Sequence, residues 1–385
     1  MSIALFWALT WLLFNLASHF GRRLRLVPIV SQLLFASFGL PLLLLYGIEP
    51  VAGLNAQALL APAAIGWLYG LSFALLLGWI LSDVIDLELD LQSVKIALPS
   101  FLVPFGCGLA CALWLLPPQP WLSSVAIGLL FSITAIPVLY LYLQNIGYPA
   151  AATRRLLHAA ILMDLLCWSL FALAQGSTQL DRLLWPLLGA VLPLLLRALG
   201  LRHGLAYSLP FFALMVLLQH FKLNALIFGI GYMLCLAWLK LPFRLPLPEA
   251  LWQRLLNGLA IPLILTCGVL QVNFHTAWRD YSWLYLGTLL VLPVLSKLAG
   301  NWLGLSWADP QARPAQKWRE SLLLNIRGLT EIVFLNLLLQ QQLIDPLVYF
   351  SLLLMSLFST LLPALLGIRQ APVPPEPPRS VHAVR

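Results

Sequence analysis

Residues 153–175 read TRRLLHAAILMDLLCWSLFALAQ, and this stretch decides the fold class. After two arginines it is largely apolar, over a length that suits a helix crossing about 30 Å of hydrocarbon. Its one acidic residue, Asp164, stands near the middle, where a charge in lipid is costly. Apolar stretches of similar length recur from one end of the chain to the other. The pattern predicts an all-α membrane protein with many spans.

The composition of the chain points to the same class. Of its 385 residues, 61% are hydrophobic and 9% are charged, against about 25% charged in soluble domains. The alternating segments of about 10 residues that mark a transmembrane β-barrel are lacking. The net charge of +8 lies in short basic clusters between apolar segments, so we expect no nucleic-acid partner. The five cysteines fall inside apolar segments without metal-ligand company, so we expect neither a resident metal nor a cofactor.

Hydropathy along the chain predicts roughly thirteen membrane-spanning helices. The predicted spans are 2–18, 27–46, 60–85, 97–116, 121–143, 155–175, 183–199, 204–219, 223–240, 252–272, 282–302, 320–341 and 344–367.

The positions of the 22 Lys and Arg residues predict the orientation of these spans. Nearly all lie in alternate connections or in the C-terminal tail. The exceptions are Arg182, Lys222 and Arg279 in the opposite connections, and Lys297 and Arg327 within spans. The asymmetry predicts an N-terminus outside and a cytoplasmic C-terminus. Residues 1–370 form the predicted transmembrane domain, and the Pro-rich tail 371–385 is expected to be disordered and cytoplasmic.

Charged residues within predicted spans are candidates for function because lipid disfavours them. They are Asp164, Lys297, Arg327 and Glu331. Burial disfavours the charged form of an isolated carboxylate, so Asp164 would hold a proton when alone and release it when a cation arrives. A structural ion pair with Lys297 or Arg327 is the alternative. Snorkelling toward the cytoplasm is the alternative for Lys297.

An acidic run follows the third predicted span. It contains Asp83, Asp86, Glu88 and Asp90. A solvated loop edge explains it, and a funnel that attracts cations is the other interpretation.

Two predicted spans carry helix-breaking residues. Residues 131–144, FSITAIPVLYLYLQ, place Pro137 next to Ser132 and Thr134, and proline removes a backbone donor. Residues 322–340, LLLNIRGLTEIVFLNLLLQ, bring together Asn325, Arg327, Gly328, Thr330 and Glu331. A simple proline kink is the plain interpretation of the first segment. Interrupted helices in both halves of a chain, however, are typical of an inverted-repeat transporter with its site between them.

Several segments resemble the sodium/hydrogen exchanger family, in its cation:proton antiporter-2 branch, which includes Kef-type membrane domains. They are FGRRLRLVPIV at 20–30, LELDLQSVK at 87–95 with Asp86 where glycine is usual, SITAIPVL at 132–139, and NIRGLTE at 325–331 with Ile326 replacing proline. Lys297 also falls where this family often has a lysine. The resemblance covers nearly the whole chain.

This resemblance implies a core that moves against a second, dimerising domain. The core would comprise about 97–175 and 282–367 and contain two crossed, partly unwound helices. A monovalent cation, Na+ or K+, would compete with a proton for Asp164, near Thr134, Ser132 and main-chain carbonyls. The implied supporting charges and breaks are Lys297, Arg327, Glu331, Asn325, Pro137 and Gly328. The expected protein is a homodimer in a bacterial inner membrane and not an enzyme.

One position departs from the family pattern. The usual acid pair is Asp-Asp or Asn-Asp, whereas this chain has Met163 before Asp164. A thioether cannot form an ion pair with a lysine, so Lys297 is left to pair with Asp164 or Glu331, or to remain neutral. With one acid left to titrate, we expect any exchange to be electroneutral.

Other functions remain open on sequence grounds. The loss of the first acid favours another solute on the same fold, such as an organic anion, or a membrane sensor that does not transport. An intramembrane enzyme is disfavoured, because an aspartyl protease needs two facing acids and the histidines are scattered among different segments.

Overall fold

The computed structural model describes residues 3–23, 28–48, 56–82, 90–116, 119–176, 184–201, 203–221, 223, 225–272 and 283–366. All regular elements in these ranges are helices. Helices suit a lipid environment because each one satisfies its own backbone hydrogen bonds. The predicted tail and the acidic residues Asp83, Asp86 and Glu88 lie outside the described residues.

Two groups of helices make up the described chain. The first contains α7 (Leu91–Trp114), α8 (Trp121–Ser132), α9 (Ile136–Asn145), α10 (Ala150–Gly176), α18 (Trp283–Ala308), α19 (Pro314–Leu324), α20 (Leu329–Gln340) and α21 (Pro346–Leu365). The second contains α1 (Ile3–Arg23), α2 (Pro28–Leu34), η1 (Phe35–Gly39), α3 (Leu40–Leu42), η2 (Leu43–Ile48), α5 (Ala56–Leu60), α6 (Ala63–Ser82), α11 (Leu184–Ala190), α12 (Leu192–Ala198), α13 (Gly204–His220), α14 (Ala225–Leu239), α15 (Glu249–Leu255), η5 (Leu256–Ala260) and α16 (Ile261–Val269).

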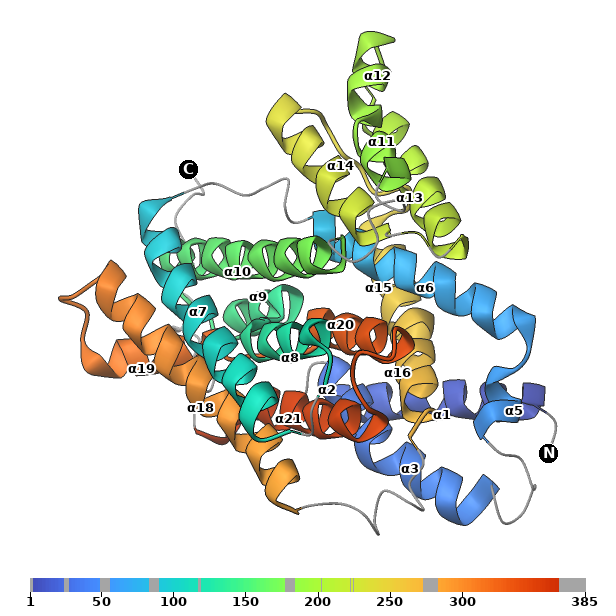
Figure 1. Ribbon diagram of the computed structural model, residues 1–385, viewed down its shortest axis with the longest axis horizontal. Helices are drawn as coiled ribbons and strands as arrows, with labels where there is room; N and C mark the ends of the chain where they lie inside the picture. Colours follow the sequence, from blue (N-terminus) through green and yellow to red (C-terminus); the bar gives the residue numbers. More distant parts are fainter. Residues whose placement is uncertain are drawn as a thin grey trace, which may run out of the picture.

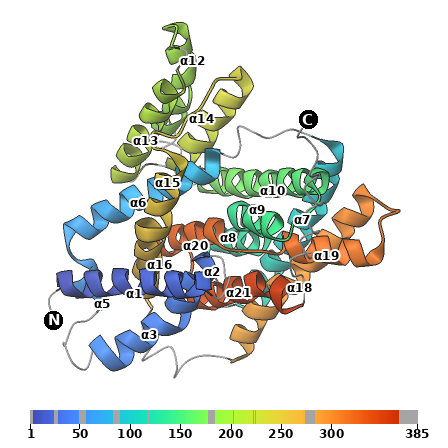
Figure 2. The same cartoon turned by 180° about the vertical axis from the view of Figure 1, so that it is seen from behind.

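Figure 1 shows how the two groups are arranged. Helices α8, α9 and α20 are enclosed between α10 and α21, and α7 and α18 run along one edge of this bundle. Helices α1, α6 and α16 lie at the opposite edge. The segment α11–α14 extends away from the bundle, as the view from behind also shows (Figure 2).

The prediction of an all-α protein with many apolar helices is confirmed. In the part of the chain that the structure describes, seven helices are long and apolar enough to cross a membrane. Shorter apolar helices occupy most of the other predicted spans. The count of thirteen spans stays a prediction.

Both predicted helix interruptions are present. The span predicted at 121–143 is divided into α8 and α9, with residues 133–135 not helical. The span predicted at 320–341 is divided into α19 and α20 by residues 325–328. Pro137 is the second residue of α9, a position in the first helical turn that tolerates a missing N–H.

Glycines set the spacing between α7 and α18. A Cβ atom added to Gly300 would lie 2.6 Å from the carbonyl oxygen of Pro99, and one on Gly304 would lie 2.5 Å from that of Ile96. The two backbones can approach this closely only because glycine has no side chain, as in small-residue packing of membrane helices. The close packing brings Lys297 of α18 beside Ser100 of α7.

Candidate functional site

The two interrupted helices meet at their breaks. The N–H of Ala135 donates to the carbonyl of Ile326 over 3.1 Å. The hydroxyl of Thr134 donates to the carbonyl of Leu324 over 3.4 Å. These bonds join main-chain segments almost 200 residues apart and satisfy groups that each break leaves without a helical partner.

Basic side chains hold the last carbonyls of α8. The guanidinium of Arg327 donates to the carbonyls of Leu130 and Phe131, each over 2.6 Å. The ammonium of Lys297 donates to the carbonyl of Ser132. The C-terminus of a helix carries partial negative charge and unpaired carbonyls, so two buried cations are favourable there.

Asp164 lies beside the other end of the first break. Its side chain is buried on α10, and the backbone N–H of Thr134 donates to Oδ1 over 3.3 Å. Thr134 lies two residues before the start of α9, and the amide groups at the N-terminus of a helix favour an anion. The structure therefore brings together Asp164 and Thr134, which the sequence analysis had singled out.

Ser132 contributes differently from Thr134. Its hydroxyl donates to the carbonyls of Phe101 over 3.0 Å and Gly128 over 3.2 Å. Its carbonyl, rather than its hydroxyl, therefore faces the ammonium of Lys297.

Arg327 and Glu331 form an ion pair across one turn. The distance from the guanidinium to Oε1 is 2.9 Å, and both side chains are fully buried. The pairing agrees with their spacing of four residues on a helical face. A buried pair keeps both charges only while both partners remain. The positive charge of Arg327 beside α8 is therefore compensated by the negative charge of Glu331 on α20.

Lys297 makes contacts that the sequence did not indicate. Besides Ser132, its ammonium donates to the carbonyl of Ser100 over 3.2 Å and lies 3.4 Å from the sulfur of Met163. The sequence analysis left Lys297 to pair with Asp164 or Glu331 or to remain neutral, but Glu331 pairs with Arg327. A thioether accepts hydrogen bonds only weakly, and the two carbonyls supply the stronger acceptors.

Two residues of α21 complete the second break and were missed by the sequence analysis. The hydroxyl of Ser359 donates to the carbonyl of Asn325, and that of Thr360 donates to the carbonyl of Arg327, each over 2.6 Å. The side-chain amide of Asn325 is buried and has no hydrogen-bond partner among the described residues. The available signal was a set of hydroxyl residues, Ser356, Ser359 and Thr360, at helical spacing in an apolar span.

Gly328 lies in the second break, close to Ala135 and Val138. Its φ is +158°, and a Cβ atom there would lie 2.9 Å from Cγ2 of Val138 on α9. Any larger residue would push α20 away from α9.

Comparison with known proteins shows what the chain is similar to. No family model matches the chain. The chain is 23% identical over 325 residues to cation/H(+) antiporter 15 of Arabidopsis thaliana, covering 77% of this chain and 39% of that protein. It is 26% identical over 322 residues to the Na(+)/H(+) antiporter NhaS4 of a Synechocystis strain, covering 74% of this chain and 76% of that protein. The chain thus spans about two fifths of the length of the plant relative.

The fold has a solved counterpart. The sodium proton antiporter MjNhaP1 of Methanocaldococcus jannaschii superposes with a TM-score of 0.57 at 15% identity, over 95% of this chain and 96% of that chain. These similar proteins are transporters, which supports the expectation that the chain is not an enzyme. In sequence this chain is thus similar to cation:proton antiporters, and its fold is similar to that of a sodium proton antiporter.

Proposed function

We propose that the chain is a secondary transporter that exchanges a monovalent cation, Na+ or K+, for protons. The observation that carries the proposal is the position of Asp164, buried at the junction of two broken helices and bonded to the N–H of Thr134. A carboxylate at this depth needs either a proton or a cation. One carboxylate that holds each in turn, but not both, couples their movements.

Charged residues around the junction bind the end of α8 and balance one another's charge. Lys297 and Arg327 donate to carbonyls at the end of α8, and the transported ion binds at Asp164 beside the break between α8 and α9. Glu331 offsets the charge of Arg327. The core formed by residues 97–175 and 282–367 then carries the site from one side of the membrane to the other by moving against the remaining helices.

The resemblance to antiporters also supports a proposal for the assembly and location of the chain. We infer a homodimer in a bacterial inner membrane, with the N-terminus outside and the C-terminus in the cytoplasm. The chain binds monovalent cations and protons, and it is embedded in the lipid bilayer.

Proton exchange in everted vesicles tests the proposed function. A pH gradient is formed, and Na+, Li+ and K+ are added in turn. The wild-type protein is expected to dissipate the gradient with at least one cation, and Asp164→Asn is expected to abolish the effect because an amide cannot exchange a proton. Asp345→Asn makes the same change at an exposed position before α21 and is expected to retain exchange.

Two results would overturn the proposal. Activity in a folded Asp164→Asn protein would remove the carboxylate from the mechanism. A folded wild-type protein that exchanges none of the three cations would favour another solute, such as an organic anion, or a sensor that does not transport.

A further inference from the structure

A close contact joins α16 to the ends of two core helices. Gly268 of α16 lies so near Tyr349 of α21 that an added Cβ atom would overlap the tyrosine hydroxyl and lie 2.8 Å from Oδ1 of Asn336 on α20. Tyr349 and Asn336 are fully buried, and the amide of Asn336 donates to the hydroxyl of Tyr349 over 3.3 Å. Since only glycine fits here, the contact depends on the absence of a side chain at position 268.

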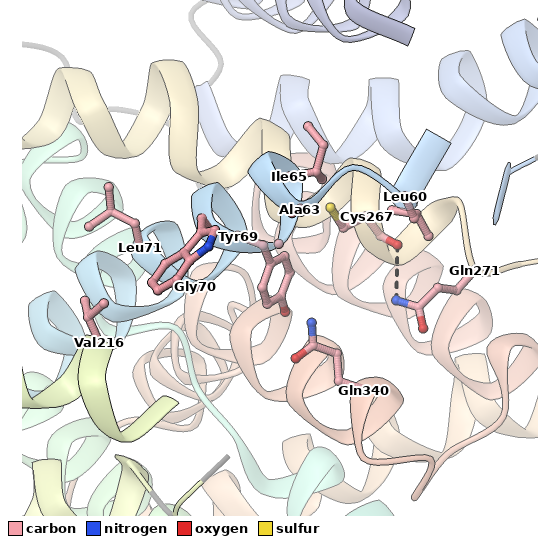
Figure 3. A pocket seen from close by; sticks show the side chains of 12 residues that line it. Leu60, Ala63, Ile65, Tyr69, Gly70, Leu71, Val216, Cys267, Gln271 and Gln340 are labelled. Carbon is pink, nitrogen blue, oxygen red and sulfur yellow. Dashed lines mark hydrogen bonds between the residues drawn. The ribbon is translucent and has the colours of Figure 1, made fainter. Parts of the chain in front are cut away.

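A cavity of about 510 Å³ begins beside this contact. Figure 3 shows that Cys267, the neighbour of Gly268, lies in its wall together with Tyr69 of α6 and the amide side chains of Gln271 and Gln340. The amide of Gln271 donates to the carbonyl of Cys267 over 3.2 Å. The residues that line the cavity are uncharged and mostly apolar, and the amides of Gln271 and Gln340 are polar groups in its wall that suit water or a hydrated ion.

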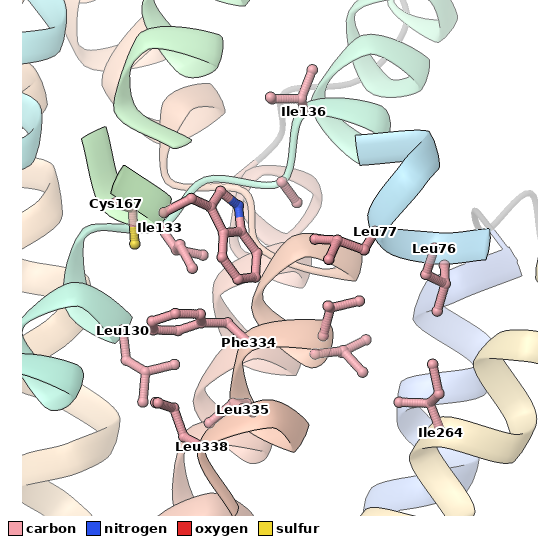
Figure 4. Close-up of a cluster of buried hydrophobic side chains, with 14 of the residues drawn as sticks. Leu76, Leu77, Leu130, Ile133, Ile136, Cys167, Ile264, Phe334, Leu335 and Leu338 are labelled. Carbon is pink, nitrogen blue, oxygen red and sulfur yellow. The ribbon is translucent and has the colours of Figure 1, made fainter. Parts of the chain in front are cut away.

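The contact stands between this cavity and the proposed site. Asn336 follows Glu331 by five residues on α20, about 7.5 Å along a helix axis at 1.5 Å per residue. On the site side of Gly268, Ile264 of α16 and Leu77 of α6 belong to the same buried apolar cluster as Phe334 of α20 (Figure 4). The boundary between α16 and the core is thus apolar near the site and closed at Gly268.

Two polar atoms at the contact remain unsatisfied. The hydroxyl of Tyr69 and Oδ1 of Asn336 are buried and have no hydrogen-bond partner among the described residues. Buried polar groups normally have a partner, and each exception calls for an explanation. Water or a passing cation would satisfy both atoms if α16 moved away from α20 and α21.

We propose that the contact of Gly268 with Tyr349 and Asn336 is a gate, and that the adjoining cavity is the vestibule through which cation and proton reach Asp164 from that side of the membrane. The proposal rests on the proposed exchange function. It assigns the closed state to the arrangement described here and the open state to one in which α16 has separated from the core. In the predicted topology the vestibule faces outward.

Labelling of Cys267 tests the gate without relying on transport. A charged, membrane-impermeant maleimide is applied to either face of membrane vesicles, and mass spectrometry locates the modified cysteine. Wild-type Cys267 is expected to react slowly, and from one face only. Gly268→Ala places a methyl group in the contact and holds the gate open, which raises the rate about 10-fold or more if the open state is a minor one in the wild type.

A second variant opens the gate by a change on α21, opposite Gly268. Tyr349→Leu withdraws the hydroxyl and the ring atoms that close the contact, and it is also expected to raise the rate of labelling. The matched control is Gly66→Ala, in the wall of the same cavity, because an added Cβ atom there meets no atom within 4 Å. This control should label as the wild type does.

Several outcomes would overturn the gate. They are unchanged labelling in a folded Gly268→Ala or Tyr349→Leu protein, and equal labelling of wild-type Cys267 from both faces. Another is a wild-type Cys267 that never reacts under conditions that modify the denatured chain. Each is independent of the vesicle exchange assay, so failure of the gate and failure of the antiport proposal can be told apart.

Discussion

Arg327 is fully buried, and its guanidinium donates hydrogen bonds to three acceptors. Its guanidinium reaches the carboxylate of Glu331 and the carbonyls of Leu130 and Phe131. Loss of one partner of a buried ion pair costs about 3–5 kcal/mol, and each carbonyl left without a donor adds about 1–3 kcal/mol. The two members of the pair therefore differ in importance, because only Arg327 also holds α8.

This difference predicts the order of two stability losses. Arg327→Gln should lower the midpoint of thermal unfolding in detergent more than Glu331→Gln, which leaves both carbonyl bonds intact. Arg313→Gln, at an exposed position before α19, should leave the midpoint nearly unchanged. Equal losses for the first two variants would show that the carbonyl bonds contribute little.

Met163 provides a second prediction at the residue scale. Lys297 lies 3.4 Å from its sulfur, so Met163→Asp would place a carboxylate within reach of the ammonium and add a second titrating acid. We expect wild-type exchange in liposomes to be insensitive to an imposed membrane potential and exchange by Met163→Asp to respond to it. One net charge per cycle adds about 2.3 kcal/mol of driving force per 100 mV.

Met163→Leu is the control for this substitution, because it preserves an apolar side chain of similar size. It should remain insensitive to potential. A wild-type protein that moves net charge would contradict the expected electroneutral exchange.

At the scale of the elements, the close packing of α18 against α7 positions Lys297. Gly304 packs against main-chain atoms of Ile96, between 2.5 and 3.1 Å from an added Cβ atom, and a backbone cannot move aside as a flexible side chain can. Gly304→Ala should therefore cost about 1–3 kcal/mol, as overpacking does. Gly287→Ala, on the same helix, meets no atom within 4 Å and should be neutral. Thermal unfolding of both variants measures the difference, and equal midpoints would argue against close packing at this crossing.

A polar cluster ties α10 to α19 away from the crossing. Glu320 is buried and accepts from Arg155 over 2.9 Å, from the hydroxyl of Tyr148 over 2.9 Å and from the amide of Gln316 over 3.0 Å. Burial and the adjacent carboxylate of Glu320 raise the pKa of Tyr148 above its ordinary value. The cluster fixes the helix that carries Asp164 relative to one half of the second broken helix.

For the whole molecule, these clusters show which ends of the helices share a side, and the orientation of the termini stays a prediction. Arg155 and Glu320 meet in space, and both are expected near the cytoplasmic face. Gln271 and Gln340 line one cavity, and both are expected near the outer face. Independent residue pairs therefore agree on which ends of the helices share a side.

Reporters on the two termini check this topology. A fluorescent protein fused to the C-terminus should fluoresce in the cytoplasm, and an epitope at the N-terminus should be accessible from outside in spheroplasts, which lack the outer-membrane barrier. As a control, the epitope placed at the C-terminus should be accessible only after permeabilisation. The reverse pattern would place the vestibule beside Gly268 on the cytoplasmic side.

The sequence by itself determined the all-helical membrane class and the two interrupted helices, and it singled out Asp164, Arg327 and Glu331 as candidate site residues. These features depend on local properties, namely apolar length, helix-breaking residues and the four-residue spacing of Arg327 and Glu331. The tertiary structure alone decided which distant groups meet. It turned Lys297 toward main-chain carbonyls and Met163, brought Ser359 and Thr360 to the second break, and joined Arg155 to Glu320. Such contacts depend on how helices far apart in sequence cross and which buried polar groups are then left to be satisfied, and no local pattern encodes that choice.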